Sequence, residues 1–227
     1  ANELRIGNSV HHPLWGKDIV VGFDNIRFHD DFIPIPINGK WLEKFGFEYS
    51  FINGEDKIQF KNNSISLSQS SSGIQSLIPL LILFDYYFLP YELETEKSFL
   101  IEEPELNLYP IKQKHLIEYI IGKNACTENK LIMTTHSPYI LSVLDTLMLA
   151  KNTFNEHPDL KEEITAIISE DNWIDYDYIS VFEFRNDGKV YSIKNEEFRS
   201  IDTNAIDGVS DIISEEFDKL TELRYAH

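Results

Sequence analysis

Two short apolar segments of this sequence end in side chains that can take part in chemistry. Residues 98–101 (SFLI) lead directly into the carboxylates Glu102 and Glu103, and residues 130–133 (KLIM) lead into two threonines and His136. Adjacent carboxylates repel each other unless a cation lies between them, so the acid pair itself suggests a metal ion. These groups can work together only in a fold that holds the two segment ends side by side.

The segment between them has the pattern of a helix. Pro110 suits the first helical turn, and apolar residues follow at the spacing of one helix face, at Leu116, Ile117, Ile120 and Ile121. When a helix joins two strands it returns the chain, so the strands run parallel. In such sheets the chemistry gathers at the carboxyl ends of the strands. We therefore expect the acid pair and the histidine to meet at one edge of an α/β fold.

The composition is that of a globular protein with one substantial core. The chain has 227 residues, of which 42% are hydrophobic and 26% charged. The formal net charge is −18, and residues 156–227 carry 19 acidic and 7 basic side chains, a difference of −12. Such an acidic surface repels a phosphate backbone, so we do not expect this chain to grip nucleic acid by itself.

Three features predict a cytoplasmic location. No apolar run approaches the ~20 residues that a membrane span needs. The first residues lack the basic and apolar regions of an export signal. Cys126 is the single cysteine, which excludes an internal disulfide and fits a reducing compartment.

Residues 1–60 predict a small β-rich segment. Stretches rich in Val, Ile and Phe are typical of short strands, whereas the prolines of residues 33–37 exclude a central strand. A helical turn ending near Gly46 and another strand follow. His11 and His12 resemble a metal pair but have no third ligand at a suitable spacing, so we assign them to the surface. The segment resembles small uncharacterised β-rich proteins with ELRIGN near their start and a later WLxKFGF block, which assigns no chemistry.

Residues 61–227 predict a larger α/β domain. Ser72 and Gln75 fit a capping box at the start of a buried helix, which Pro79 should kink. A further helix is expected from Pro138 to about Val143.

Several short elements are expected after that helix. TLMLA (146–150) and TAIIS (165–169) are candidate strands, and a hairpin is expected to turn at residues 186–188, Asn-Asp-Gly. Apolar residues between Val209 and Leu220 form a stripe that would cover the core on a terminal helix.

Four motifs occur in order along this domain: SSGIQ (71–75), FLIEEPE (99–105), ELNLYP (105–110) and TTHSPYIL (134–141). This order resembles the ABC-class ATPases, specifically the RecF/SMC-like branch of bacterial ATPases that includes OLD-type and phage-defence proteins. In that comparison the motifs correspond to the signature, the Walker B strand with its catalytic glutamate, the D-loop and the switch histidine loop. The implied fold is an α/β, partial P-loop NTPase lobe with parallel strands and flanking helices.

The resemblance implies roles for six residues. Glu102 would hold Mg²⁺, Glu103 would orient and polarise the attacking water, and His136 would contact the γ-phosphate of ATP. The signature would present a helix start to the nucleotide held by the opposite subunit, through Ser72, Gly73 and Gln75. The working assembly would be a head-to-tail dimer with ATP at the interface. A nucleic acid or an effector protein would bind to the full assembly.

The sequence also departs from the family pattern. Glu102 stands where transporters have Asp, and the other departures are Ser71 and Ile74 in the signature and Asn107 and Tyr109 in the D-loop. No G-x-x-x-x-G-K-[ST] motif occurs in this chain, so a Walker A loop for the triphosphate is missing from it. We therefore expect a carboxyl-terminal ATPase lobe that hydrolyses ATP only when a P-loop-bearing lobe, on a longer protein or another chain, completes the site.

Two other functions are left open by the residues. One is a non-catalytic interaction module descended from such a lobe. The other is a metal-dependent phosphoesterase that uses four side chains, Glu102, Glu103, Glu105 and His136.

Overall fold

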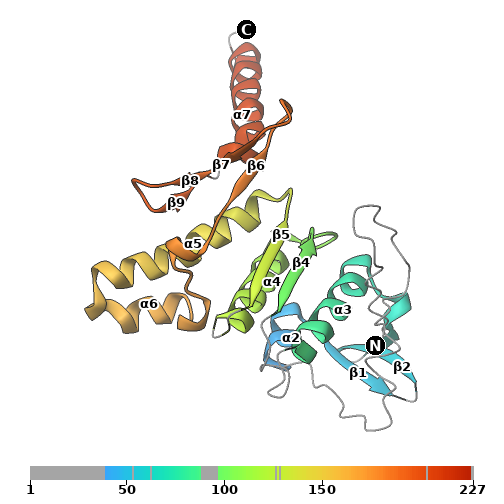
Figure 1. Cartoon of the computed structure of the whole chain (residues 1–227). Helices are drawn as coiled ribbons and strands as arrows, with labels where there is room; N and C mark the ends of the chain where they lie inside the picture. The colour runs from blue at the N-terminus through green and yellow to red at the C-terminus, as the bar shows by residue number, and fades with distance from the viewer. Residues whose placement is uncertain are drawn as a thin grey trace. The chain divides into compact units, whose positions relative to one another are not determined.

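The computed structural model describes residues 39–52, 54–61, 63–87, 97–125, 127, 129–202 and 204–225 (Figure 1). The chain divides into two compact units, which comprise Ala1–Glu43 with Phe47–Leu89 and Lys44–Gly46 with Pro90–His227. The first unit thus extends past residue 60, where the sequence predicts a boundary, because two paired strands lie on either side of that position. The predicted strands before residue 39, the His11–His12 pair and Cys126 lie outside the described residues.

The first unit is built on a three-stranded antiparallel sheet and one long helix. Its elements are most of α2 (Gly39–Phe45), whose last two residues belong to the second unit, and β1 (Glu48–Ile52), β2 (Glu55–Phe60), β3 (Asn63–Ser66), the 3-10 helix η1 (Leu67–Gln69) and α3 (Ser72–Tyr87). Helix α2 ends before Gly46, whose φ of 82° is the left-handed conformation that commonly closes a helix. The predicted helical turn near Gly46 and the strand after it are confirmed.

Helix α3 carries the apolar stripe of this unit. Its buried side chains recur at helical spacing, at Leu77, Ile78, Leu81, Ile82 and Phe84. The helix continues through Pro79. The predicted capping box is wrong, because the side-chain amide of Gln75 donates to the carbonyl oxygens of Ser68 (3.2 Å) and Ser70 (2.7 Å) instead of reaching back to Ser72. The backbone amide of Gln75 donates to the Ser71 carbonyl, which is the first hydrogen bond of the helix, so Ser71 is the N-cap.

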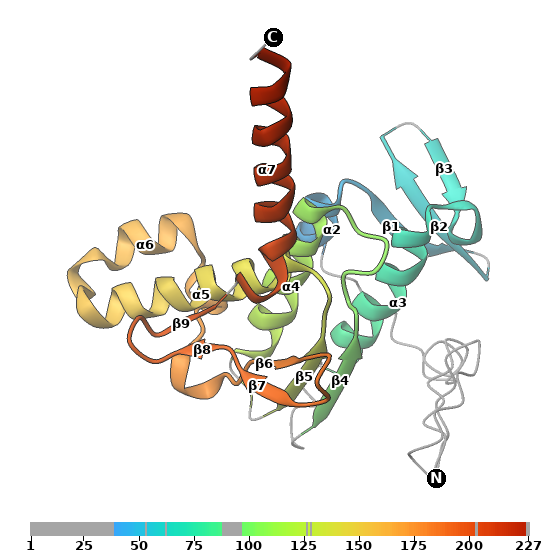
Figure 2. The ribbon, with the colours of Figure 1, turned by 90° about the horizontal axis from the view of Figure 1, so that it is seen from above.

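The second unit contains a parallel strand pair with helices beside it (Figures 1 and 2). Its main elements are β4 (Ser98–Glu102), α4 (Pro110–Asn124), β5 (Lys130–Thr134), α5 (Pro138–Glu156) and α6 (Lys161–Ile167). Strands β4 and β5 pair in parallel with Glu102 opposite Thr134. One face of the pair packs toward the helices, since Ile101 is buried and Met133 lies against the core of α4 and α5. The predicted strand-helix-strand unit is confirmed, with Pro110 at the first position of its helix.

The core of this unit shows why two predicted strands are wrong. Residues 146–150 lie within α5 and residues 165–167 within α6. The buried side chains of α5 recur three and four positions apart, at Ile140, Leu141, Leu144, Leu147 and Met148. This is the period of one helix face, and it continues well past Val143, where the sequence predicts the helix to end.

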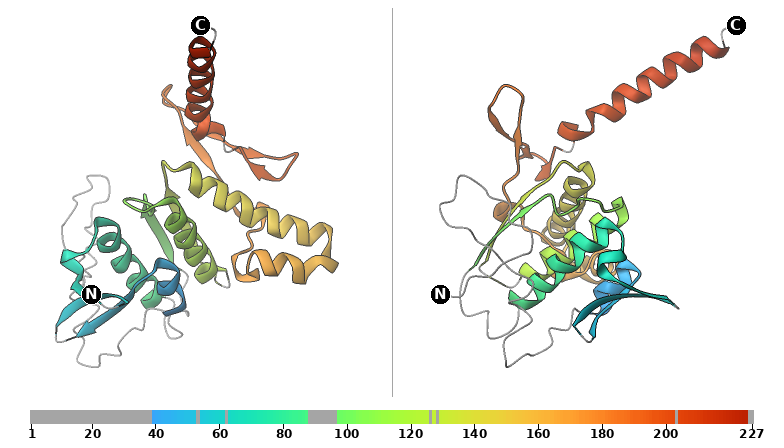
Figure 3. Two further views of the ribbon diagram at one scale, coloured as in Figure 1. Left: turned by 180° about the vertical axis from the view of Figure 1, so that it is seen from behind. Right: turned by 90° about the vertical axis from the view of Figure 1, so that its right-hand side faces the viewer.

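The chain ends in small strands and a long helix. These elements are η3 (Pro158–Leu160), η4 (Glu170–Asn172), η5 (Tyr176–Tyr178), β6 (Phe182–Phe184), β7 (Val190–Ser192), β8 (Lys194–Asn195), β9 (Ser200–Ile201) and α7 (Asn204–Tyr225). The predicted β6–β7 hairpin is confirmed, with Gly188 at a φ of 76° in its turn. Helix α7 is also confirmed (Figure 3). Where the structure describes the side chains of its apolar stripe, from Ile212 onward, they are exposed and do not cover the core as predicted, among them Ile213, Phe217 and Leu220.

The predicted fold class is confirmed: the protein is α/β, with a parallel strand pair and flanking helices in one unit and an antiparallel sheet in the other.

Among the helices that the structure describes, none combines the length and the apolar character needed to cross a membrane.

Candidate functional site

The candidate site lies at the carboxyl ends of β4 and β5. The strand pairing continues one residue beyond β4, because the amide of Glu103 donates to the carbonyl oxygen of Thr134 (3.0 Å) and lies 3.3 Å from its hydroxyl. The loop after β4 therefore begins against the loop after β5. As the sequence predicts, the acid pair and the histidine lie at the same edge of the parallel sheet.

The loop after β4 consists of two consecutive turns. The backbone amide of Leu106 donates to the carbonyl oxygen of Glu103 (3.0 Å), and the backbone amide of Leu108 donates to the carbonyl oxygen of Glu105 (2.9 Å). Asn107 has a φ of 63°, which asparagine tolerates at the third position of a turn. Glu103 has a φ of 44°, a left-handed conformation that costs a non-glycine residue about 1–2 kcal/mol. The loop thus holds Glu103 in a strained position at the strand end.

The side chain of Glu103 meets that of His136. Its Oε1 atom lies 3.3 Å from Nε2 of the histidine. The His136 side chain is 88% exposed and that of Glu103 is 40% exposed. Exposed pairs of this kind contribute about 0–1 kcal/mol, so a bound ligand can separate the two side chains at little energetic cost.

A second carboxylate, Glu105, binds the backbone of the same loop. Its Oε1 atom accepts hydrogen bonds from the hydroxyl of Thr135 and from the amide of His136 (3.1 Å). The Thr135 hydroxyl oxygen also accepts from the amide of Ser137 (3.0 Å). The glutamate is buried, with 8% of its surface exposed, and its Oε2 atom has no partner among the described residues.

Gln113 joins helix α4 to both loops. Its Oε1 atom accepts from the Ser137 hydroxyl (2.6 Å), and its Nε2 atom donates to the carbonyl of Leu108 (2.9 Å). Sequence reasoning missed Gln113 and Thr135 as members of the site. Neither residue gives a signal by itself, because Gln113 binds the hydroxyl of Ser137 and Thr135 binds the carboxylate of Glu105, and these partners lie 24 and 30 residues away in the sequence.

Glu102 is the predicted magnesium ligand. It is exposed at the end of β4, on the sheet face opposite the buried Ile101. No group of three His, Cys, Asp or Glu side chains in the described residues is placed to hold a metal ion. Mg²⁺ is commonly bound by one or two carboxylates together with substrate phosphates and water, so Glu102 fits such a shared site.

The metal-dependent phosphoesterase is predicted to use Glu105 together with the acid pair and the histidine. That function needs Glu105 as a metal ligand, whereas the Glu105 carboxylate is buried and hydrogen-bonded to Thr135 and His136. In the described part of the chain, the acids and the histidine do not form a metal cage.

The predicted nucleotide-binding residues Ser72, Gly73 and Gln75 lie in the first unit, at the start of α3. Ser72 and Gln75 are exposed, and Gly73 is buried. The Gln75 side chain donates to the carbonyl oxygens of Ser68 and Ser70 before the helix, so it links the helix start to the segment around η1.

Helix α4 is anchored below the site by a buried carboxylate. Glu118 accepts hydrogen bonds from the ammonium groups of Lys114 and, at 3.4 Å, Lys44. Burial acts to raise the pKa of Glu118, but these two lysines outweigh it and the pKa is lowered. Burial also lowers the pKa of His115, against the opposing charge of Glu118. The helix that carries Gln113 is thereby linked to Lys44.

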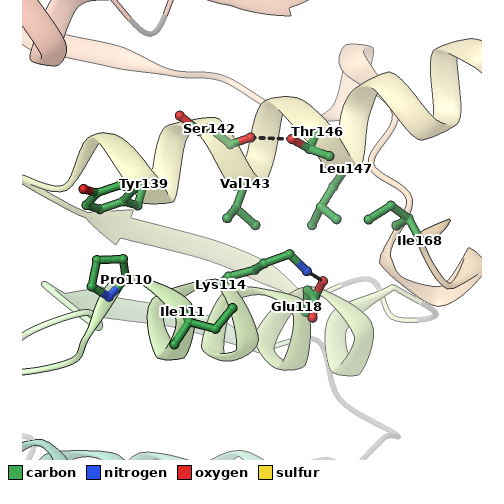
Figure 4. A pocket seen from close by; sticks show the side chains of 10 residues that line it. All are labelled: Pro110, Ile111, Lys114, Glu118, Tyr139, Ser142, Val143, Thr146, Leu147 and Ile168. Carbon is green, nitrogen blue, oxygen red and sulfur yellow. Dashed lines mark hydrogen bonds and ion pairs between the residues drawn. The ribbon is translucent and has the colours of Figure 1, made fainter. Parts of the chain in front are cut away.

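A groove of about 340 Å³ runs between α4 and α5 (Figure 4). Its walls are mainly apolar and include Ile111, Val143 and Leu147. Three of its polar side chains have partners: Lys114 binds Glu118, and the hydroxyl groups of Ser142 and Thr146 donate to backbone carbonyls of their own helix. The groove is therefore mainly apolar, and it lies on the α4 and α5 side chains and not at the strand ends.

The strand ends thus bring Glu103 and His136 together at one edge of a parallel strand pair, and the comparisons with known proteins give the family. The AAA ATPase domain family matches residues 25–141, more than half of the chain. The chain belongs to the AAA ATPase domain family.

No curated protein matches the chain. A solved structure from work on the ATP-driven dimerization and DNA-stimulated activation of SMC ATPases is similar at 15% sequence identity and a TM-score of 0.41, covering 79% of this chain and 90% of that one.

Proposed function

We propose that this chain is an ATPase lobe of the ABC-class, RecF/SMC-like kind that hydrolyses ATP when a P-loop-bearing lobe completes its site. The observation that carries this proposal is the position of Glu103 and His136, 3.3 Å apart at the carboxyl ends of two parallel strands. Membership of the AAA ATPase domain family supports it.

In this proposal each residue has a defined role. Glu103 accepts a proton from the attacking water, and His136 leaves Glu103 to bind the γ-phosphate of ATP. Glu102 would hold a Mg²⁺ ion, which would neutralise charge on the nucleotide. Ser72, Gly73 and Gln75 contact the nucleotide held by an opposing lobe, at the amino-terminal end of α3.

The need for a second lobe is supported by the sequence and by the exposed sheet face. This chain contains no G-x-x-x-x-G-K-[ST] motif. Leu100 and Ile132 lie opposite each other on β4 and β5, and their side chains are 59% and 58% exposed. Parallel sheets are normally covered on both faces, so this apolar face fits a site that another lobe completes. We also propose that two lobes assemble head to tail in the cytoplasm. A nucleic acid or an effector protein would bind to this complete assembly.

The test is ATP turnover with Mg²⁺, measured for this chain alone and mixed with a P-loop-bearing lobe of the same family. Turnover should appear only in the mixture and fall about 100-fold or more for Glu103→Gln, the typical contribution of a general base. Glu163→Gln, an exposed substitution on α6, is the matched control and should leave the rate unchanged. Turnover that persists in the Glu103→Gln mixture would refute the proposed role.

A non-catalytic interaction module is the second candidate, because the apolar stripe of α7 is exposed. In that case the chain binds its partner lobe, and neither the mixture nor the chain alone turns over ATP.

A further inference from the structure

Three consecutive residues after β5 depend on one buried carboxylate. Glu105 accepts from the Thr135 side chain and the His136 backbone, and Thr135 in turn accepts from the Ser137 backbone. A glutamate from the loop after β4 therefore determines the course of the loop that carries the histidine. The two loops are thirty residues apart in the sequence.

Burying this carboxylate is energetically unfavourable. It is 8% exposed, and within the described residues no Lys, Arg or His side chain forms an ion pair with it. Hydrogen bonds from Thr135 and His136 reach one oxygen, while Oε2 has none in the described part of the chain. A buried, incompletely bonded carboxylate costs stability that an apolar side chain would not, which suggests that Glu105 is kept for function.

The geometry connects Glu105 to the reacting groups. Glu103 and Glu105 lie two residues apart in one turn, and both contact His136. The Glu103 side chain contacts the His136 imidazole, whereas the Glu105 side chain holds the His136 amide. A shift of the His136 backbone would therefore change the distance between the imidazole and Glu103.

We propose that Glu105 is a positioning residue: it holds the His136 backbone and the Thr135 hydroxyl so that the imidazole of His136 stays in reach of Glu103 and of the nucleotide. This inference rests on the proposed function for its effect on ATP turnover. The contact itself is independent of that function and is tested on the chain alone.

The first test measures the contact by nuclear magnetic resonance. Glu105→Ala removes the acceptor, whereas Glu105→Gln keeps a side-chain oxygen of the same reach. Exchange of the His136 amide proton should become about tenfold faster or more in Glu105→Ala, and the imidazole carbon shifts of His136 should move. Glu105→Gln should restore both signals toward those of the original chain, and Glu163→Gln should leave them unchanged.

The second test measures turnover in the completed assembly. Glu105→Ala should lower kcat about tenfold or more with KM for ATP nearly unchanged, because a misplaced histidine affects the reaction more than binding. Glu105→Gln should recover most of kcat. If Glu105→Ala does not fold, Thr135→Val, which removes one of the two donors, should give a smaller change in the same direction.

Two results would overturn the proposal: an unchanged His136 amide in Glu105→Ala, or a Glu105→Gln variant as impaired as Glu105→Ala in both tests. If the original assembly has no turnover at all, the proposed ATPase function fails, while the amide exchange and imidazole shifts still decide whether Glu105 positions His136.

Discussion

Glu118 provides the sharpest test of how the helix beneath the site is held. Its side chain is 7% exposed and binds the ammonium groups of Lys114 and Lys44, which lie 4 and 74 residues away in the sequence. The substitution Glu118→Gln keeps the shape but removes the charge that both lysines bind. We expect the second unit to lose stability.

The magnitude follows from the burial of each partner. Removing one member of a fully buried ion pair costs about 3–5 kcal/mol, and a hydrogen bond to a charged group contributes about 1.5–3 kcal/mol. Here the two lysine side chains are 44% and 41% exposed, so water screens them. We therefore expect a loss of about 2 kcal/mol, which lowers the Tm of a unit of this size by roughly 4–8 °C.

The assay is thermal or urea unfolding as a function of pH. Because the pKa of folded Glu118 is lowered, its contribution is complete above the ordinary value of 4.5 and is lost as the pH falls through the lowered value. The difference between the original chain and Glu118→Gln should therefore be full at pH 7 and should shrink below about pH 4.5. Glu163→Gln is the control. A Tm unchanged at pH 7, or a difference that persists unchanged in acid, would refute this reasoning.

Two further predictions concern the same unit. His115 has a lowered pKa, mainly because it is partly buried, so protonation favours the unfolded chain and stability should fall as the pH drops below 6.5. His115→Gln should therefore make the unfolding free energy less dependent on pH between about pH 7 and 5.5, and an unchanged slope would contradict this prediction. Removal of residues 212–227 should change the Tm of the remainder by less than about 2 °C, because the described side chains of that segment are almost all exposed. Calorimetry checks this, and a fall of several degrees would mean that the α7 stripe packs against the chain.

The sequence by itself determined the elements whose signals are local. One apolar run ends in acids, another ends in a histidine, and a helix pattern lies between them. These signals predicted a parallel strand pair with the acids and the histidine at one edge, and the structure has this arrangement. Such signals lie within a few residues, where side-chain periodicity and proline or glycine conformation act directly. The β6–β7 turn was predictable for the same reason.

Only the tertiary structure decided the groups that depend on distant partners. Residues 146–150 are as compatible with a strand as with a helix until the full stripe from Ile140 to Met148 is buried in one core. The bonds of Glu105 to Thr135 and of Gln113 to Ser137 join loops that no short window of sequence contains. A carboxylate is buried or exposed according to what the folded chain places around it, and this is why Glu102 and Glu105, three residues apart, have different surroundings and different expected roles.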